Sequence, residues 1–224
     1  MGKIALFSLL FWITGNPFLA LFLLLVILYF LDMRYVRLLP DLFRPLRLNS
    51  RLAKLRQQLR VNPHDTSAKW EAARILMEQR RYPEALAYLE EIRSVVDDSA
   101  EFLCEYGICL LKTGEKEIGE EWIRKALSLN PRVKYGEPYL HLAEAFARED
   151  VSKALAYLQE LKGLHSSSAE VCYRLGQLYQ RLGQKEEAHA AYREAIDVYK
   201  GLPAYKKRTE RRWALLARMN AWKQ

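Results

Sequence analysis

The sequence predicts an all-α protein in which an N-terminal transmembrane helix precedes an α-solenoid of about four helix pairs and a C-terminal capping helix. Residues 4–31 contain no charged side chain, the chain after Pro63 shows helical periodicity only, and turn signals recur every 15 to 20 residues. We divide the chain into an anchor at 1–33, a basic juxtamembrane segment with a leading helix at 34–63, a helical array at 64–200 and a basic capping helix at 201–224.

The N-terminal apolar run is long enough to cross a bilayer. Its 28 residues, at about 1.5 Å each in a helix, exceed the roughly 30 Å hydrocarbon thickness. It is longer than the apolar core of a cleaved signal peptide, so we expect it to be retained in the mature protein. Gly15, Asn16 and Pro17 interrupt the run. Either the spanning helix begins at Pro17, with residues 4–14 interfacial or re-entrant, or one kinked, tilted helix covers everything.

The net charge of +8 is unevenly distributed. Residues 33–60 carry eight Lys or Arg against one Asp, and residues 205–224 carry seven against one Glu. Residues 61–204 carry 19 basic and 24 acidic side chains, a net charge of −5. The basic flank after the anchor predicts a cytoplasmic array by the positive-inside rule and attraction to anionic lipid. The three cysteines have no CxxC spacing and are interpreted as buried thiols.

The array repeats with a period of 34 residues. Ala73 and Gly107 are one period apart, and Pro63 and Pro131 are two periods apart. At this spacing the sequence resembles the tetratricopeptide repeat, in which Leu-Gly and a large residue mark the first helix and Ala, an aromatic residue and Ala mark the second. The last copy matches best, with Leu175, Gly176, Tyr179, Ala188, Tyr192 and Ala195.

Four copies align through one small residue in each first helix: Ala73, Gly107, Ala143 and Gly176. The intervals of 34, 36 and 33 residues predict local irregularity at 133–136 and at Glu149. Small residues let the two helices of a pair approach closely, and each pair needs neighbours to bury its apolar face. Helices are also predicted at 49–60, ahead of the first repeat, and at 202–222, as the cap.

The resemblance implies that the first helices line a concave surface that binds a peptide or a helix of another protein. By register, the partner-binding positions are Trp70, Arg74, Met77, Ile108, Leu111, Lys112, Glu144, Arg148, Tyr173, Gln177 and Arg181. Of these, Trp70, Met77, Ile108 and Tyr173 would receive apolar anchors of the partner. Alternatively, the C-terminal helix or the 49–60 helix covers these side chains. The Lys and Asn clamp that some family members use for chaperone tails is absent.

The sequence contains no pattern typical of an enzyme. Its four histidines are scattered, and it has no HExxH pair, phosphate-binding glycine loop or GxSxG elbow. We therefore expect no catalytic residue, no metal site and no cofactor. The basic C-terminal cluster lacks interleaved aromatic residues, so nucleic acid is not an expected partner.

The predicted function is a membrane-tethered scaffold or adaptor for protein–protein interaction, in a single-pass membrane protein with its repeats on the cytoplasmic side. The alternative is an assembly factor or regulator of a membrane or envelope-biogenesis enzyme that it recognises partly through the anchor. The plan also resembles bacterial envelope-assembly proteins that carry repeats behind one anchor and end in a rubredoxin-like CxxC pair. This chain lacks that pair.

Overall fold

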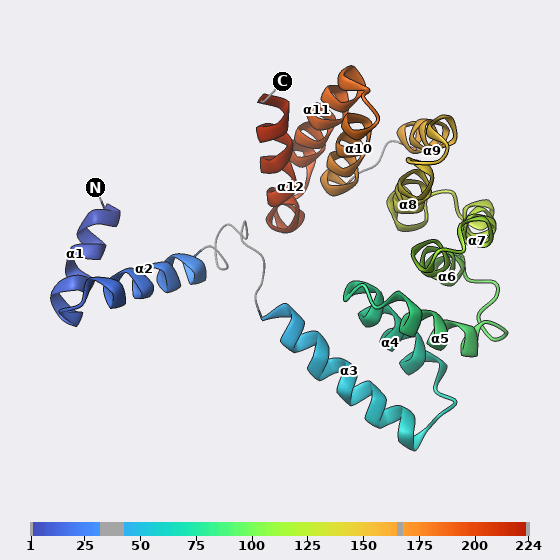
Figure 1. The fold of residues 1–224 in the computed structure, drawn as a ribbon, viewed down its shortest axis with the longest axis horizontal. Coiled ribbons are helices and arrows are strands. Elements are labelled where there is room, and N and C mark those ends of the chain that lie inside the picture. The colour runs from blue at the N-terminus through green and yellow to red at the C-terminus, as the bar shows by residue number, and fades with distance from the viewer. Residues whose placement is uncertain (1, 32–42, 165–167, 223–224) are drawn as a thin grey trace.

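The computed structural model describes residues 2–31, 43–164 and 168–222. Within these residues the secondary structure is helical, with twelve α-helices, one short 3₁₀ segment and no strand. The predicted all-α class is confirmed. Figure 1 shows the helices after residue 43 arranged as an arc.

The N-terminal apolar run forms two short helices, α1 (Gly2–Thr14) and α2 (Pro17–Leu31), which contact each other. Gly15 adopts φ +63°, a left-handed conformation that ends α1. The side-chain oxygen of Asn16 accepts hydrogen bonds from the backbone N–H of Phe18 at 2.9 Å and of Leu19 at 3.4 Å. Asn16 therefore caps a new helix, and the version with a separate helix from Pro17 is the one observed.

The predicted transmembrane helix is wrong, because none of the described helices is both long enough and apolar enough to cross a bilayer. α1 has 13 residues and α2 has 15, so each is only about 20 Å long against a hydrocarbon thickness of roughly 30 Å. The length of the apolar run predicted one spanning helix, but the turn at Gly15 divides the run into two shorter helices. The prediction of a single-pass membrane protein with a cytoplasmic array is therefore also wrong, and recognition of a membrane enzyme through the anchor loses its support.

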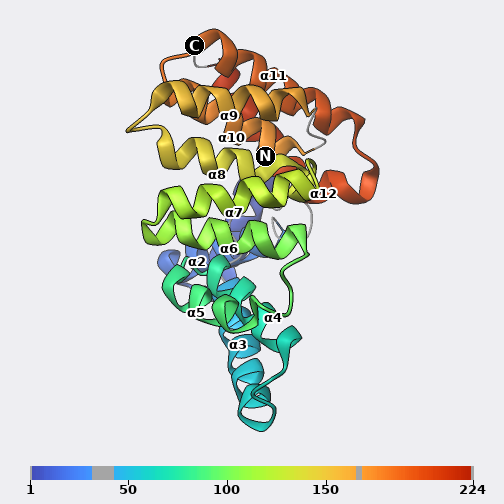
Figure 2. The ribbon, with the colours of Figure 1, turned by 90° about the vertical axis from the view of Figure 1, so that its right-hand side faces the viewer.

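Four helix pairs form the array: α4 (Thr66–Glu78) with α5 (Tyr82–Ile92), α6 (Ala100–Thr113) with α7 (Lys116–Leu129), α8 (Glu137–Phe146) with α9 (Val151–Gly163), and α10 (Ala169–Arg181) with α11 (Lys185–Gly201). The first helix of each pair lies on the inner side of the arc and the second on the outer side (Figure 1). Figure 2 shows the successive helices side by side. This is the stacking that the period of 34 residues predicts.

Local sequence explains where the first helices begin. Asp65, Ser99 and Ser168 precede α4, α6 and α10, and each side chain accepts a hydrogen bond from the backbone N–H three residues on. These caps satisfy N–H groups that have no partner inside the helix. α8 begins differently, after the 3₁₀ segment η2 (Val133–Gly136), in which Lys134 and Tyr135 have φ of +48° and +57°. The irregularity predicted at 133–136 is therefore present.

Close approach of paired helices explains the small residues at the aligned positions. A Cβ atom added to Gly107 would lie 2.7 Å from the backbone oxygen of Gly119, and one added to Gly119 would lie 2.8 Å from the backbone oxygen of Gly107. One added to Gly176 would lie 2.6 Å from the ring of Tyr192. The α6–α7 pair thus packs backbone against backbone, and the α10–α11 pair packs backbone against an aromatic ring.

Helix α3 (Arg44–Val61) precedes the array and packs its buried Leu52 and Leu55 against α4. It starts earlier than the predicted 49–60. Arginines of this helix make ion pairs with the first repeat, among them Arg44–Glu78 at 2.5 Å, Arg51–Glu71 at 2.5 Å and Arg56–Glu84 at 3.2 Å. This part of the basic flank therefore faces carboxylates of the array, while Arg34 and Arg37 lie outside the described residues.

Helix α12 (Ala204–Trp222) closes the other end by packing against α10 and α11. Its Ala217 is fully buried and its Ala214 is 7% exposed, so both small side chains lie on the covered face of the helix. α12 therefore occupies the place of a capping helix (Figure 1).

Candidate protein-binding groove

The inner side of the arc contains an open groove of about 1510 Å³ that runs along α4, α6, α8 and α10. Its lining includes seven of the eleven predicted partner-binding residues: Met77, Ile108, Lys112, Glu144, Arg148, Gln177 and Arg181. The groove arises because each first helix turns the same repeat positions inward. Among the described residues of the four second helices, only Tyr82, at the start of α5, lines it.

The other four predicted residues, Trp70, Arg74, Leu111 and Tyr173, do not line the groove. Leu111 is 5% exposed. Its Cγ would lie 3.0 Å from a Cβ atom added to Gly119, so it packs between α6 and α7. Leu111 is therefore a core residue of its own helix pair.

Trp70 and Arg74 hold a buried carboxylate. Glu105 of α6 is 2% exposed, and its oxygens accept hydrogen bonds from Trp70 Nε1 at 2.5 Å, from Arg74 Nε at 2.9 and 3.0 Å, and from Lys134 Nζ at 2.5 Å. Arg74 also lies over the Trp70 ring, 4.4 Å from its centroid. The cluster links α4, α6 and η2, and it satisfies a charge that would otherwise be very unfavourable to bury.

Tyr173 is covered by the capping helix, as the alternative prediction has it. Its ring is 6% exposed and lies 5.6 Å from the ring of Trp213 and 5.7 Å from that of Tyr192. Its hydroxyl group accepts hydrogen bonds from Gln177 Nε2 at 3.0 Å and from Asn220 Nδ2 at 3.3 Å. Tyr173 therefore attaches α12 to α10.

The floor of the groove carries a row of alternating charges on α6, α8 and α10. Lys112 Nζ lies 3.1 Å from Glu144, and Arg174 lies 3.3 Å from Glu137. Between them His141 lies 3.7 Å from Glu144 through Nδ1 and 3.6 Å from Glu137 through Nε2. Neither contact is short enough for a firm hydrogen bond, and His141 Nδ1 is buried without a hydrogen-bond partner among the described residues.

These contacts shift the titration of the row. Burial opposes protonation of His141, but the carboxylates of Glu137 and Glu144 outweigh it and raise its pKa above the usual value of 6.5. Burial by itself would raise the pKa of Glu144, yet the polar contact with His141 and the charge of Lys112 lower it to about 2. The polar contact with His141 is also the main cause of the lowered pKa of Glu137.

Sequence reasoning missed Glu105, Lys134, His141 and Arg174. A signal for Glu105 was present, because it is the one charge in the apolar stretch 102–111. A lone charge inside a buried run needs partners. Lys134 gave no such signal, since it reaches Glu105 only through the left-handed backbone of η2.

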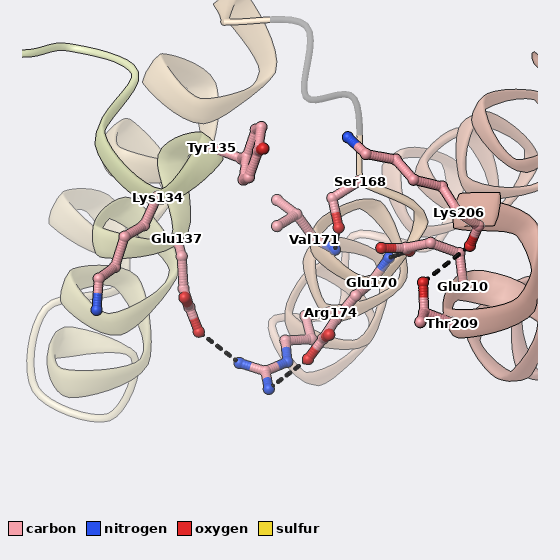
Figure 3. Close-up of a pocket in the computed structure, with 10 residues that line it drawn as sticks. All are labelled: Lys134, Tyr135, Glu137, Ser168, Glu170, Val171, Arg174, Lys206, Thr209 and Glu210. Carbon is pink, nitrogen blue, oxygen red and sulfur yellow. Dashed lines mark hydrogen bonds and ion pairs between the residues drawn. The ribbon is translucent and has the colours of Figure 1, made fainter. Parts of the chain in front are cut away.

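A second cavity, of about 300 Å³, lies where α8, α10 and α12 meet (Figure 3). Arg174 joins Glu137 to Glu170 in its wall, at 3.3 and 2.7 Å. Glu210 of α12 accepts a hydrogen bond from the backbone N–H of Glu170 at 3.1 Å. Three cations and three carboxylates line the cavity. Its polar groups therefore fasten the cap to the array.

Two families match the array by sequence. The family described as "YpiA-like, C-terminal tetratricopeptide repeats" matches residues 67–132, and the family described as "Tetratricopeptide repeat" matches residues 169–202. The chain contains tetratricopeptide repeats. These matches span the first two tetratricopeptide pairs and the last one, so the predicted resemblance is confirmed there.

Solved structures share the tetratricopeptide architecture. One crystal structure of MamA has a TM-score of 0.53 and 16% identity, covering 72% of this chain and 96% of that one. A thermophilic tetratricopeptide protein from Thermus thermophilus has a TM-score of 0.50 and 24% identity, covering 78% of this chain and 94% of that one. At such identities the likeness shows the fold alone. No curated protein matches the chain.

Proposed function

We propose that the chain is a protein-interaction scaffold whose tetratricopeptide groove holds a segment of a partner protein. The observation that carries the proposal is the groove itself, which has a volume of about 1510 Å³ and is lined by residues of four first helices. Pockets for small molecules are usually enclosed and of about 300–1,000 Å³. A long open groove suits a polypeptide better.

The chemistry of the described residues supports binding rather than catalysis. Burial raises the pKa of Cys104, Cys109 and Cys172 to about 12 in each case, so these thiols stay protonated and unreactive near neutral pH. On the groove floor Lys112 pairs with Glu144 and Arg174 pairs with Glu137. Function then rests on the shape and charge of the groove, and the proposal includes no reaction and no cofactor.

Site-specific photo-cross-linking in cells tests the proposal. A photoreactive amino acid replaces Met77 or Gln177, which line the groove, or Ala87 or Ala190, which are exposed on second helices. We expect a discrete protein adduct from the two groove positions and none from the two outer positions. Adducts from the outer positions alone, or from none of the four, would contradict the proposal.

A further inference from the structure

The groove is basic although the array is acidic. Its lining contains seven cationic side chains, Arg44, Arg80, Lys112, Lys134, Arg148, Arg174 and Arg181, against the three carboxylates of Glu78, Glu137 and Glu144. Including Glu105, which lies behind Lys134, still leaves an excess of three positive charges. Residues 61–204 as a whole carry a net charge of −5. Positive charge is thus concentrated in the groove, although the array as a whole has a negative net charge.

Three of these cations form a ladder. Lys112, Arg148 and Arg181 are separated by 36 and 33 residues. These are the intervals that separate the aligned residues Gly107, Ala143 and Gly176. The three side chains therefore occupy one repeat position, near the ends of α6, α8 and α10, and all three line the groove. We call them the basic ladder.

Two rungs of the ladder have no ion-pair partner in the part of the chain that the structure describes. Among the described residues, Arg148 and Arg181 are exposed and make no ion pair or side-chain hydrogen bond, and Lys112 is paired only with Glu144. By contrast, Lys134 is bound to Glu105 at 2.5 Å and Arg174 to Glu170 at 2.7 Å. A favourable interaction with the C-terminal end of a helix accounts for one cation at a time. It does not account for a continuous row that faces the groove.

We propose that the groove binds an extended acidic segment of a partner protein, with carboxylates three residues apart that pair with the basic ladder. This inference rests on the proposed function of the groove as a polypeptide site. Packed helices lie roughly 8–10 Å apart. An extended chain in the polyproline II conformation advances about 3.1 Å per residue with three residues per turn, so every third side chain lies on the same face. Three residues of extended chain therefore match the step from one rung to the next.

The groove suits an acidic peptide better than a nucleic acid, which is the other common polyanion. Single-stranded nucleic acid is held largely by aromatic side chains on which bases stack. Tyr82 is the one Phe, Trp or Tyr residue that lines the groove within the described chain, and apolar side chains such as Met77, Ile108 and Leu178 accompany it.

Fluorescence anisotropy with defined probes tests the inference. The main probe is a labelled twelve-residue peptide with glutamate at every third position and alanine or serine elsewhere, and a control peptide has glutamine in place of glutamate. We expect the acidic peptide to bind the full chain, more weakly as salt rises. Binding should be at least tenfold weaker for the double variant Arg148→Glu, Arg181→Glu. The matched variant Lys185→Glu, Arg193→Glu has the same change in net charge on exposed positions of α11 and should bind like the wild type.

Three results would overturn the inference: equal binding of the acidic and glutamine peptides, equal loss in both double variants, or tighter binding of a labelled twelve-residue oligothymidylate than of the acidic peptide. Photo-cross-linking from Met77 separates this failure from failure of the proposed function. An adduct that survives Arg148→Glu with Arg181→Glu would leave the scaffold intact and remove the acidic-segment inference. Absence of an adduct from both Met77 and Gln177 in the otherwise unaltered chain would remove the proposed function itself.

Discussion

The carboxylate of Glu105 is a buried charge that connects the first two repeats. It is 2% exposed and accepts hydrogen bonds from Trp70, Arg74 and Lys134. Glu105→Gln keeps the shape of the side chain and removes the charge. Arg74 and Lys134 then lose their buried counter-charge, and the amide group presents its own N–H donors to theirs. We expect a large loss of stability with the fold retained.

The size of the expected loss in stability depends on how exposed the side chains of Arg74 and Lys134 are. Removing one member of a fully buried ion pair costs about 3–5 kcal/mol. The side chains of Arg74 and Lys134 are 42% and 24% exposed, so water stabilises part of their charge once Glu105 is gone. We therefore expect the free energy of unfolding to fall by about 2–4 kcal/mol. In a chain of this size that corresponds to a fall in Tm of roughly 5–15 °C.

Thermal unfolding followed by far-ultraviolet circular dichroism measures the effect. The matched control is Glu101→Gln, because Glu101 is 53% exposed and, among the described residues, pairs only with Arg74, at 3.0 Å. The control should lower stability by less than about 0.5 kcal/mol. A fall in Tm for Glu105→Gln no larger than that of the control would refute the role assigned to the buried cluster.

Three further predictions concern packing, titration and the cap. Gly107→Ala forces a Cβ atom against the backbone of α7 and should lower the free energy of unfolding in urea by about 1–3 kcal/mol. Gly201→Ala, where a Cβ atom would have no neighbour within 4 Å, should leave it unchanged. Equal effects of the two substitutions would contradict the close approach of α6 and α7. His141 has a raised pKa, so its stabilisation is complete below its unfolded value of 6.5 and is lost as pH rises through the folded value. The Tm advantage of wild type over His141→Gln should shrink from pH 5.5 to pH 9, and an advantage that stays constant or grows would contradict a raised pKa of His141. Trp213→Ala removes the ring that covers Tyr173 and should increase hydrogen exchange in α12 but not in α4, and uniform exchange would show that the cap is not a separate contact.

The repeat architecture could be predicted because close approach leaves a periodic mark in the sequence. Gly107 and Gly176 are small for a steric reason that the structure bears out, and their spacing locates the helix pairs. The inward direction of Met77, Lys112 and Arg181 followed from the same register. Periodicity indicates which face of a helix is turned inward, and that information was enough to predict most of the residues that line the groove.

The same register could not say what covers an inward side chain. Trp70 and Tyr173 have the size and position of binding residues, but Trp70 donates to Glu105 and Tyr173 lies under Trp213. Both contacts come from outside the repeat to which the residue belongs. The transmembrane prediction failed for a related reason. Hydropathy counts apolar residues and does not register that one left-handed residue, Gly15, ends a helix.

Trp70 and Tyr173 are held by contacts within the chain, so they add little to the affinity of the groove for a partner. Exposed ion pairs contribute about 0.2–1 kcal/mol each, so three rungs supply at most about 3 kcal/mol. A dissociation constant of about 1 μM corresponds to roughly 8 kcal/mol. Among the apolar lining residues, Ile108 and Leu178 are each only 4% exposed, whereas Met77 is partly exposed, so the groove offers little apolar area to make up the difference. We therefore expect the basic ladder to set the register and the association rate of a partner, in a complex with a dissociation constant above about 1 μM.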